Sequence, residues 1–214
     1  MRIIIVGGIA AGMSAAAKLR RTDRDAEIVV YEKSPHISFG ACGLPYYVGG
    51  NFDNIDRMLV RTPEKVRETG IDVKVEHEVL SLDVQNKTIK VKDLQSGEIF
   101  SDKYDKLMIA TGAATIIPPI ENIETAYTLR SVEDGEKLKV KMQDESIKKV
   151  AVIGAGFIGL EVADVAKELG KEVCVFNMGS RILEKVLDEE VTEILEENLR
   201  AHGVELYFNT IVKS

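Results

Sequence analysis

The chain has 214 residues, of which 45% are hydrophobic and 29% charged, and its formal net charge is −7. This composition suits one or two packed domains, excludes wholesale disorder, and lacks the clustered basic face that nucleic-acid binding requires. The chain has no run of about 18–20 apolar residues, which excludes a membrane span, and its two cysteines are too few for a disulfide scaffold, so we expect a cytoplasmic protein.

The first predicted elements form a β-α-β unit at the N-terminus. The apolar run Ile3–Val6 is shorter than the hydrophobic region of a signal peptide, which needs about 7–15 apolar residues, and glycines follow it at once. We expect a helix over Met13–Arg21 and a second strand over Ile28–Tyr31. Continuous apolar runs such as these are typical of buried parallel strands.

The middle of the chain has a different pattern, in which polar turns separate short strands. Three of these strands are expected to form a small antiparallel meander: His77–Val84, Thr88–Lys92 and Glu98–Phe100. A buried strand is then expected over Leu107–Ala110, and Pro118 with Pro119 indicates a boundary. The charged stretch Glu133–Ser146 predicts a surface helix.

A second β-α-β unit follows that boundary. Its predicted elements are a strand beginning at Val150, a helix over Val162–Leu169 and a strand over Val173–Phe176. An amphipathic helix over Asp188–His202, with Gly203 as its C′ residue, precedes a last strand at Val204–Phe208. The apolar positions of that helix at helical spacing are Val191, Ile194, Leu195 and Leu199.

These elements predict an α/β fold of tandem Rossmann-like dinucleotide-binding domains. Parallel sheets with helices make up both domains, and the small antiparallel meander lies between the two β-α-β units. A complete mononucleotide-binding fold needs more strands than follow Lys149. The second domain is therefore predicted to be incomplete, and the chain is interpreted as a fragment.

The glycines of the second unit form a full G-x-G-x-x-G motif. Gly154 permits a tight turn, Gly156 lets a pyrophosphate approach the backbone, and Gly159 lets the helix pack on the strand. Free N–H groups at the helix N-terminus then attract phosphate. The alternative, a glycine turn that binds no ligand, is the rarer case when strand, glycines and helix agree.

The first unit departs from that motif. Gly7 and Gly12 occupy its first and last positions, but Ile9 stands where the middle glycine is expected. Glu32 follows the second strand, where a carboxylate accepts hydrogen bonds from ribose hydroxyls. The matching position of the second unit is Asn177, whose neutral amide leaves the choice between NADH and NADPH open. Arg181 is a candidate phosphate contact or a solvated arginine.

The two cysteines differ in their surroundings. Cys42 lies in a segment rich in glycine and small residues, where a thiol near a helix N-terminus has a lowered pKa and is nucleophilic. Cys174 lies within a predicted strand and suits a small buried hydrophobe.

Five segments together carry a specific resemblance. They are VGGIAAGMSAAAKLRR, SFGACGLPYYVGG, TPEKV, YDKLMIATGA and VIGAGFIGLE. In this order and spacing the chain resembles the single-cysteine branch of the flavin-dependent pyridine nucleotide–disulfide oxidoreductases. That branch includes coenzyme A-disulfide reductase, NADH oxidase and NADH peroxidase. The resemblance implies an FAD-binding domain over 1–116, a connecting segment over 117–147 and a partial NAD(P)-binding domain over 148–214.

The resemblance also implies the site residues. Those expected to bind FAD are Gly7, Gly8, Ala10, Gly12, Glu32, Lys33, Val79, Thr111, Gly112 and Arg130. Those expected to bind NADH or NADPH are Gly154, Gly156, Phe157, Ile158, Gly159, Glu161 and Asn177. Contacts to coenzyme A are implied for Ser14, Lys18, Arg21 and Ser38, although Lys18 and Arg21 also suit an ordinary solvated helix face. The histidines match no metal-ligand spacing, and we expect no metal site.

Cys42 is implied to be the redox-active residue, reduced by NAD(P)H through FAD. Relatives with two cysteines carry the second one five positions later, where this chain has Tyr47. Cys42 is therefore expected to cycle through a mixed disulfide with a small thiol, or through a sulfenic acid.

Two positions bear on the substrate. NADH peroxidases and similar oxidases carry a histidine where this chain has Ala10, which favours coenzyme A disulfide or another small disulfide over oxygen. Against that, the reductases usually carry Asn at the position of Ala41. The alternatives that stay open are an NADH oxidase forming water or peroxide, and a nucleotide-binding module without turnover. In this family a second FAD contact and a C-terminal domain that forms a homodimer lie beyond the part matched here.

Overall fold

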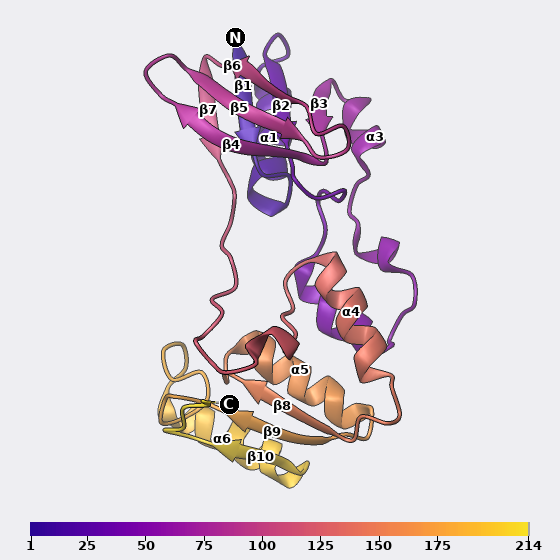
Figure 1. The fold of residues 1–214 in the computed structure, drawn as a ribbon, viewed down its shortest axis with the longest axis vertical. Coiled ribbons are helices and arrows are strands. Elements are labelled where there is room, and N and C mark those ends of the chain that lie inside the picture. Colours follow the sequence, from indigo (N-terminus) through magenta and orange to yellow (C-terminus); the bar gives the residue numbers. More distant parts are fainter. Residues whose placement is uncertain (214) are drawn as a thin grey trace. The chain divides into compact units, whose positions relative to one another are not determined.

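The computed structural model describes residues 1–213, which form two compact units (Figure 1). Unit 1 comprises Met1–Gly40 and Asp56–Ala114, and unit 2 comprises Ala41–Ile55 and the chain from Thr115 onward. The segment around Cys42 thus groups with unit 2, although it lies within the first domain predicted from the sequence.

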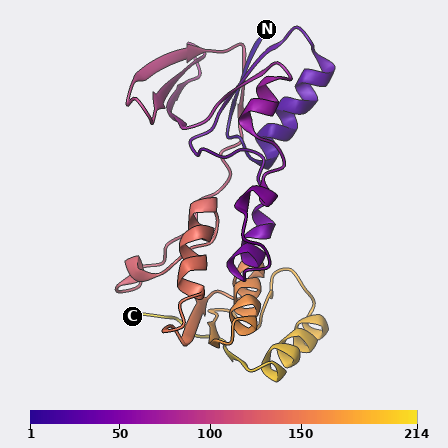
Figure 2. The same ribbon diagram turned by 90° about the vertical axis from the view of Figure 1, so that its right-hand side faces the viewer.

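Unit 1 is built on a four-stranded parallel sheet. Its strands, in spatial order, are β3 (Ile71–Lys74), β2 (Glu27–Tyr31), β1 (Arg2–Val6) and β7 (Lys106–Ile109). Helices α1 (Ala10–Thr22) and α3 (Pro63–Arg67) bury one face of this sheet around Ile5 and Val30. The antiparallel meander covers the other face, opposite α1 (Figure 2).

The meander consists of β4 (His77–Asp83), β5 (Thr88–Asp93) and β6 (Ile99–Lys103). A side-chain network ties it to the parallel sheet. The Asp102 carboxylate accepts hydrogen bonds from the Tyr31 hydroxyl and the Arg2 guanidinium, both at 2.7 Å. Both of these donors come from the parallel sheet, so the network fixes β6 against β1 and β2.

Unit 2 contains the second β-α-β unit and its continuation. The elements are β8 (Lys149–Ile153), α5 (Phe157–Glu168), β9 (Glu172–Phe176), α6 (Glu189–Ala201) and β10 (Val204–Tyr207). The three strands are parallel in the order β10-β9-β8. The prediction of an α/β fold with two parallel sheets and a small antiparallel sheet is confirmed.

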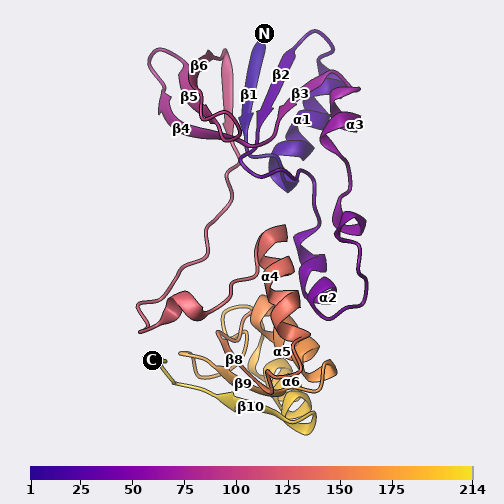
Figure 3. The ribbon, with the colours of Figure 1, turned by 45° about the vertical axis from the view of Figure 1, so that its right-hand side comes forward.

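Unit 2 also holds the helix that follows Cys42. A 3-10 turn, Ala41–Gly43, leads into α2 (Leu44–Val48), which packs against α4 (Val132–Met142) and α5 (Figure 3). The remaining 3-10 turns are Ile55–Met58 and Ile123–Thr125. At Gly135, an added Cβ would lie 2.7 Å from Leu44 Cδ2, so α2 and α4 approach closely because glycine leaves room.

Two helices bury positions that their sequence patterns do not predict. The predicted surface helix is α4, which Ser131 caps in a capping box and which buries the face that carries Val132, Leu138 and Met142. In α6 the predicted apolar positions Val191 and Ile194 are exposed. Thr192 is buried instead, and its hydroxyl is satisfied there, since it donates to Glu189 O and accepts from Arg181 within the unit. None of the helices in residues 1–213 is both long and apolar enough to cross a bilayer.

Candidate functional site

The glycine turn of unit 1 demands glycine at two positions. Gly7 has a φ of 108°, in the left-handed region, and a Cβ there would overlap the Ala110 carbonyl. A Cβ on Gly12 would overlap the Gly7 carbonyl. The first glycine therefore makes the turn beneath the end of β7, and the last lets α1 pack against that turn.

Gly8 hydrogen-bonds to the carboxylate of Glu32, the residue that follows β2. The Gly8 N–H donates to Glu32 Oε2 at 2.7 Å, and Ser34 N–H donates to Oε1 at 2.8 Å. A Cβ on Gly8 would lie 2.9 Å from Glu32 Cβ, so a side chain would displace Glu32. Glu32 is buried, and each carboxylate oxygen keeps a lone pair for a ribose hydroxyl.

The start of α1 is open to an anion. Its N-cap residue Ile9 makes no capping hydrogen bond, and the first turn, which begins at Ala10, has no acidic residue. Backbone N–H groups here lack partners within the helix and lie at the positive end of its dipole, which favours phosphate. Ser38 lies beside this turn, since its N–H donates to Gly8 O at 3.0 Å. Thr111 and Gly112 follow β7, next to Ala110, and are exposed.

The turn of unit 2 repeats this geometry. Gly154 has a φ of 106°, and a Cβ on Gly159 would overlap the Gly154 carbonyl. Gly156 is the N-cap of α5 and cannot cap it with a side chain. Apart from Gly156 itself and its two neighbours in the chain, no atom of the described residues lies within 4 Å of the place where its Cβ would be. This open space at a helix N-terminus is what a pyrophosphate needs.

Asn177 occupies the place that Glu32 has in unit 1. Ala155 N–H donates to Asn177 Oδ1 at 3.3 Å, as Gly8 donates to Glu32, and Asn177 Nδ2 donates to Arg181 O at 3.1 Å. Arg181, a candidate phosphate contact or solvated arginine, is half-buried, and its guanidinium is engaged by acceptors within unit 2. Its guanidinium donates to Leu187 O at 2.8 Å and to further acceptors within the same loop.

Cys42 is exposed, one residue before the end of the 3-10 turn that leads into α2. Tyr47, at the position of the second cysteine in two-cysteine relatives, is buried and lies under the Lys139 ammonium, 4.2 Å from the ring centroid. Cys174 is half-buried in β9, and burial, aided by the nearby Glu205 carboxylate, raises the pKa of its thiol. Cys42 is thus the accessible thiol of the two.

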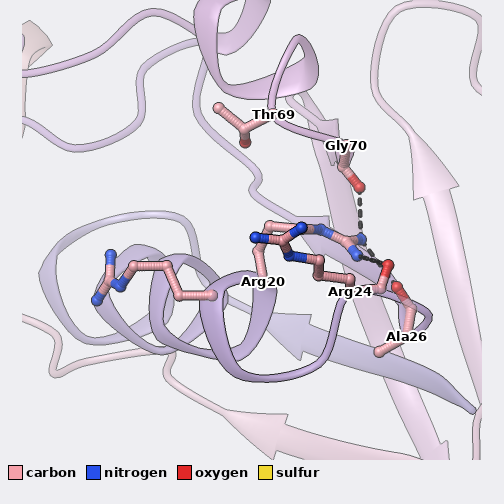
Figure 4. A pocket seen from close by; sticks show the side chains of 6 residues that line it. Arg20, Arg24, Ala26, Thr69 and Gly70 are labelled. Carbon is pink, nitrogen blue, oxygen red and sulfur yellow. Dashed lines mark hydrogen bonds between the residues drawn. The ribbon is translucent and has the colours of Figure 1, made fainter.

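The predicted coenzyme A contacts on α1 share one exposed face. Ser14, Lys18 and Arg21 are all exposed, at spacings of four and three residues. The neighbouring Arg20 has a structural role, because its guanidinium donates to the carbonyls of Arg24, Ala26 and Gly70 beside a shallow hollow (Figure 4).

The other predicted site residues are placed as follows. Lys33, Arg130, Phe157, Ile158 and Glu161 are exposed, and Val79 is half-buried in β4 beside a register shift between Val79 and Ser81. The structure joins Gly7, Gly8, Gly12, Glu32 and Ser38 around one turn, and Gly154, Gly156, Gly159 and Asn177 around the other. Within residues 1–213, no group of three or more metal-ligating side chains gathers.

Sequence reasoning missed two charged residues. Lys139 is buried on α4 and donates to Phe52 O at 3.1 Å and Asp53 Oδ1 at 3.0 Å. It shares the spacing of Val132, Gly135 and Met142, which was the available signal. Glu184 lies in the loop after β9, and its side chain folds back onto Gly179 and Ser180. Nothing in the local sequence pattern indicates that fold-back.

The sequence profile of the pyridine nucleotide-disulphide oxidoreductase family matches residues 1–214. Among curated proteins, an NADH oxidase of Methanocaldococcus jannaschii is 38% identical over 96% of this chain and 46% of its own length. A coenzyme A disulfide reductase of Staphylococcus haemolyticus is 31% identical over 100% of this chain and 48% of its own length. The chain therefore spans about half the length of these relatives.

Among solved structures, the water-forming NADH oxidase from Lactobacillus brevis bound to NADH matches with a TM-score of 0.95 and 31% identity. The match covers 100% of this chain and 48% of that one. It spans both units of the chain.

Proposed function

The chain belongs to the pyridine nucleotide-disulphide oxidoreductases, and on that basis we propose that it is part of an FAD-dependent NAD(P)H:disulfide oxidoreductase with Cys42 as the redox-active thiol. The proposed substrate is coenzyme A disulfide or another small disulfide. The observation that carries the proposal is the repeated glycine turn. Both turns have a left-handed first glycine, an uncapped helix N-terminus and a polar side chain bonded to the residue after that glycine.

Unit 1 fits the ADP half of FAD. The open N-terminus of α1 suits the pyrophosphate, and Glu32 presents buried oxygens to ribose hydroxyls. Unit 2 fits NADH or NADPH in the same way, with Gly156 leaving the space for the pyrophosphate. When bound, FAD would supply a two-electron carrier between the hydride donor and Cys42.

The proposed role of Cys42 follows from its exposure and from the absence of a second cysteine at position 47. A Cys42 thiolate attacks the disulfide RS–SR, forms a Cys42–S–SR mixed disulfide and releases one RS⁻. Two electrons and a proton from NAD(P)H then return Cys42 to the thiolate and release the second thiol. The overall reaction consumes one NAD(P)H and one proton for every disulfide converted to two thiols.

An NADH oxidase is the second candidate, because the more similar of the two relatives above carries that name. In that case Cys42 would pass through a sulfenic acid and the electron acceptor would be oxygen. Ala10 argues against this candidate, since it leaves no imidazole at the start of α1 to exchange protons with a sulfenate.

The test is to incubate the reduced chain with coenzyme A disulfide and then to measure the mass of the protein by mass spectrometry without reductant. We expect one coenzyme A adduct on Cys42, lost with dithiothreitol, unchanged in Cys174→Ser and absent in Cys42→Ser. Both variants should still bind NADH, because neither substitution touches a glycine turn. An adduct on Cys174 alone, or none on either cysteine, contradicts the proposal. Sulfenic acid on Cys42 in aerobic protein, without an adduct, favours the oxidase.

A further inference from the structure

The loop between β9 and α6 carries a carboxylate folded onto its own backbone. Glu184 Oε2 accepts hydrogen bonds from Ser180 N–H at 2.9 Å and from Ser180 Oγ at 3.3 Å. The carboxylate also lies so close to Gly179 that any side chain there would overlap it. The negative charge of Glu184 is thus held against Gly179 and Ser180, two and three residues after Asn177.

Contacts with the rest of unit 2 hold this loop in place. Leu183 N–H donates to Ala155 O at 3.1 Å, and Asn209 N–H donates to Gly179 O at 2.9 Å. Arg181, the cation nearest in sequence to Ser180, donates to Leu187 O, Thr192 Oγ1 and the backbone carbonyl of Glu184. The loop therefore presents a fixed carboxylate and no uncommitted arginine.

This place is where a Rossmann-like unit distinguishes NADH from NADPH. The side chain that ends the second strand reads the adenosine ribose, so the residues that follow it lie near the 2′ position. A 2′-phosphate carries between one and two negative charges and needs hydrogen-bond donors. Here the donors of Ser180 are already bound to Glu184, and the carboxylate repels a second anion. A 2′-hydroxyl meets neither penalty.

We propose that Glu184 is a specificity-determining residue that selects NADH against NADPH by holding a carboxylate where the 2′-phosphate would bind. This inference rests on the proposed function, in which unit 2 binds a pyridine nucleotide. In this proposal the choice between NADH and NADPH is made by Glu184, seven positions beyond Asn177. The site can therefore distinguish a 2′-hydroxyl from a 2′-phosphate although Asn177 is neutral.

The experiment measures binding of 5′-AMP, adenosine 2′,5′-bisphosphate, NADH and NADPH to the whole chain by calorimetry. Glu184→Gln keeps the side-chain size and an acceptor for Ser180 but removes the charge. We expect it to strengthen binding of the 2′,5′-bisphosphate and of NADPH by about fivefold and to leave 5′-AMP and NADH within about twofold. Glu193→Gln, which removes one charge from an exposed position of α6, is the matched control and should change none of them.

A second variant, Glu184→Ala, frees both Ser180 donors and should strengthen binding of the 2′-phosphate compounds at least as much, with an unchanged circular dichroism spectrum. If wild type, Glu184→Gln and Glu184→Ala all bind NADH normally and prefer NADH to NADPH to the same extent, the role of Glu184 is overturned and the proposed function is unaffected. Failure of the wild type to bind either NADH or NADPH would instead overturn the proposed nucleotide site of unit 2.

Discussion

At the scale of single residues, the two units use one position in two ways. Glu32 and Asn177 both follow the second strand, and both accept a hydrogen bond from the residue after the first glycine. Glu32 is a buried acidic residue, whereas Asn177 carries a neutral amide that also donates to Arg181 O. A carboxylate favours a free ribose diol and repels a 2′-phosphate, while an amide does neither strongly.

Asn177→Glu should therefore favour NADH over NADPH in unit 2. The new carboxylate can accept from Ala155 N–H as Glu32 accepts from Gly8, although the bond to Arg181 O is lost. We expect the ratio of NADPH to NADH dissociation constants to rise about fivefold in titrations with both nucleotides. Asn198→Glu, on an exposed position of α6, adds the same charge and should leave the ratio unchanged. An unchanged ratio in Asn177→Glu would mean that residues elsewhere in the loop determine the choice between NADH and NADPH.

The same scale separates the two cysteines. A thiolate is the nucleophile, so a thiol whose pKa is raised by burial reacts slowly at neutral pH. That condition applies to Cys174, which also faces Glu205. Cys42 is instead exposed to solvent, in a short turn. Exposure in a short turn, rather than sequence spacing alone, is what singles out Cys42.

At the scale of elements, the G-x-G-x-x-G turn of unit 2 makes opposite demands on two of its glycines. Gly156→Ala adds a methyl group to open space at ordinary dihedral angles, with φ −86° and ψ 179°. It should leave stability unchanged and weaken NADH binding by at least about tenfold, because the methyl occupies the pyrophosphate position. Gly159→Ala should destabilise unit 2 by about 1–3 kcal/mol, because its methyl overlaps the Gly154 carbonyl.

Urea unfolding and nucleotide titration of both variants check this contrast. Two variants with equal stability and equal affinity would show that the glycines do not have these separate roles.

The helix after Cys42 depends on a buried ammonium. Lys139→Met keeps most of the packing but removes the hydrogen bonds to Phe52 O and Asp53 and the cation over Tyr47. We expect the free energy of unfolding of unit 2 to fall by about 1–2 kcal/mol and the α2 amides to exchange faster with deuterium. Lys141→Met, at an exposed position of the same helix, is the control and should have little effect. Unchanged exchange in α2 would mean that Lys139 does not hold this helix.

The sequence predicts elements well where one local signal suffices. Continuous apolar runs such as Ile3–Val6 and Ile28–Tyr31 place β1 and β2 to within a residue, because a buried parallel strand needs no polar face. The family resemblance is likewise confirmed by the profile match. The first and last glycines of both turns have the left-handed φ or the close approach that their motif positions imply.

Features that depend on distant partners escape prediction. The buried face of α4 packs against α2, which lies some ninety positions earlier in the chain. The many charged residues of α4 obscure the apolar spacing of that face in the sequence. In α6, helical spacing predicts an apolar stripe at Val191 and Ile194, but the buried position is Thr192. The Thr192 hydroxyl accepts a hydrogen bond from Arg181, which lies outside the helix. The fold-back of Glu184 likewise depends on loop geometry that no periodicity encodes.

At the scale of the whole molecule, the hydrophobic cores of the two units are separate. Ile5 and Val30 belong to one core in unit 1, Tyr31 and Val91 belong to another, and Val152 and Val175 belong to the core of unit 2. Separate cores allow the stability of one unit to respond to a change that leaves the other unaffected. Acid is such a change for unit 1, because the contact between its two sheets depends on the charge of Asp102.

Asp102→Asn should therefore lower the free energy of unfolding of unit 1 and not that of unit 2. The loss should occur only at pH values at which the wild-type carboxyl group is ionised. Burial by itself would raise the pKa of Asp102, but hydrogen bonds from Arg2 and Tyr31 outweigh it and hold that pKa below the ordinary 3.8. A carboxyl group with a lowered native pKa stabilises the fold above its unfolded pKa and loses that effect as the pH falls through the native value. At pH 7 we expect the variant to lose about 1–3 kcal/mol, with faster deuterium exchange in β5 and β6 but not in β8 and β9. The difference from wild type should shrink as the pH falls below about 3.8. Asp25→Asn, at an exposed position of the same unit, is the control and should change the stability at pH 7 little. Faster exchange in both units, or a difference that persists at pH 2, would mean that Asp102 does not act through its charge between the two sheets of unit 1.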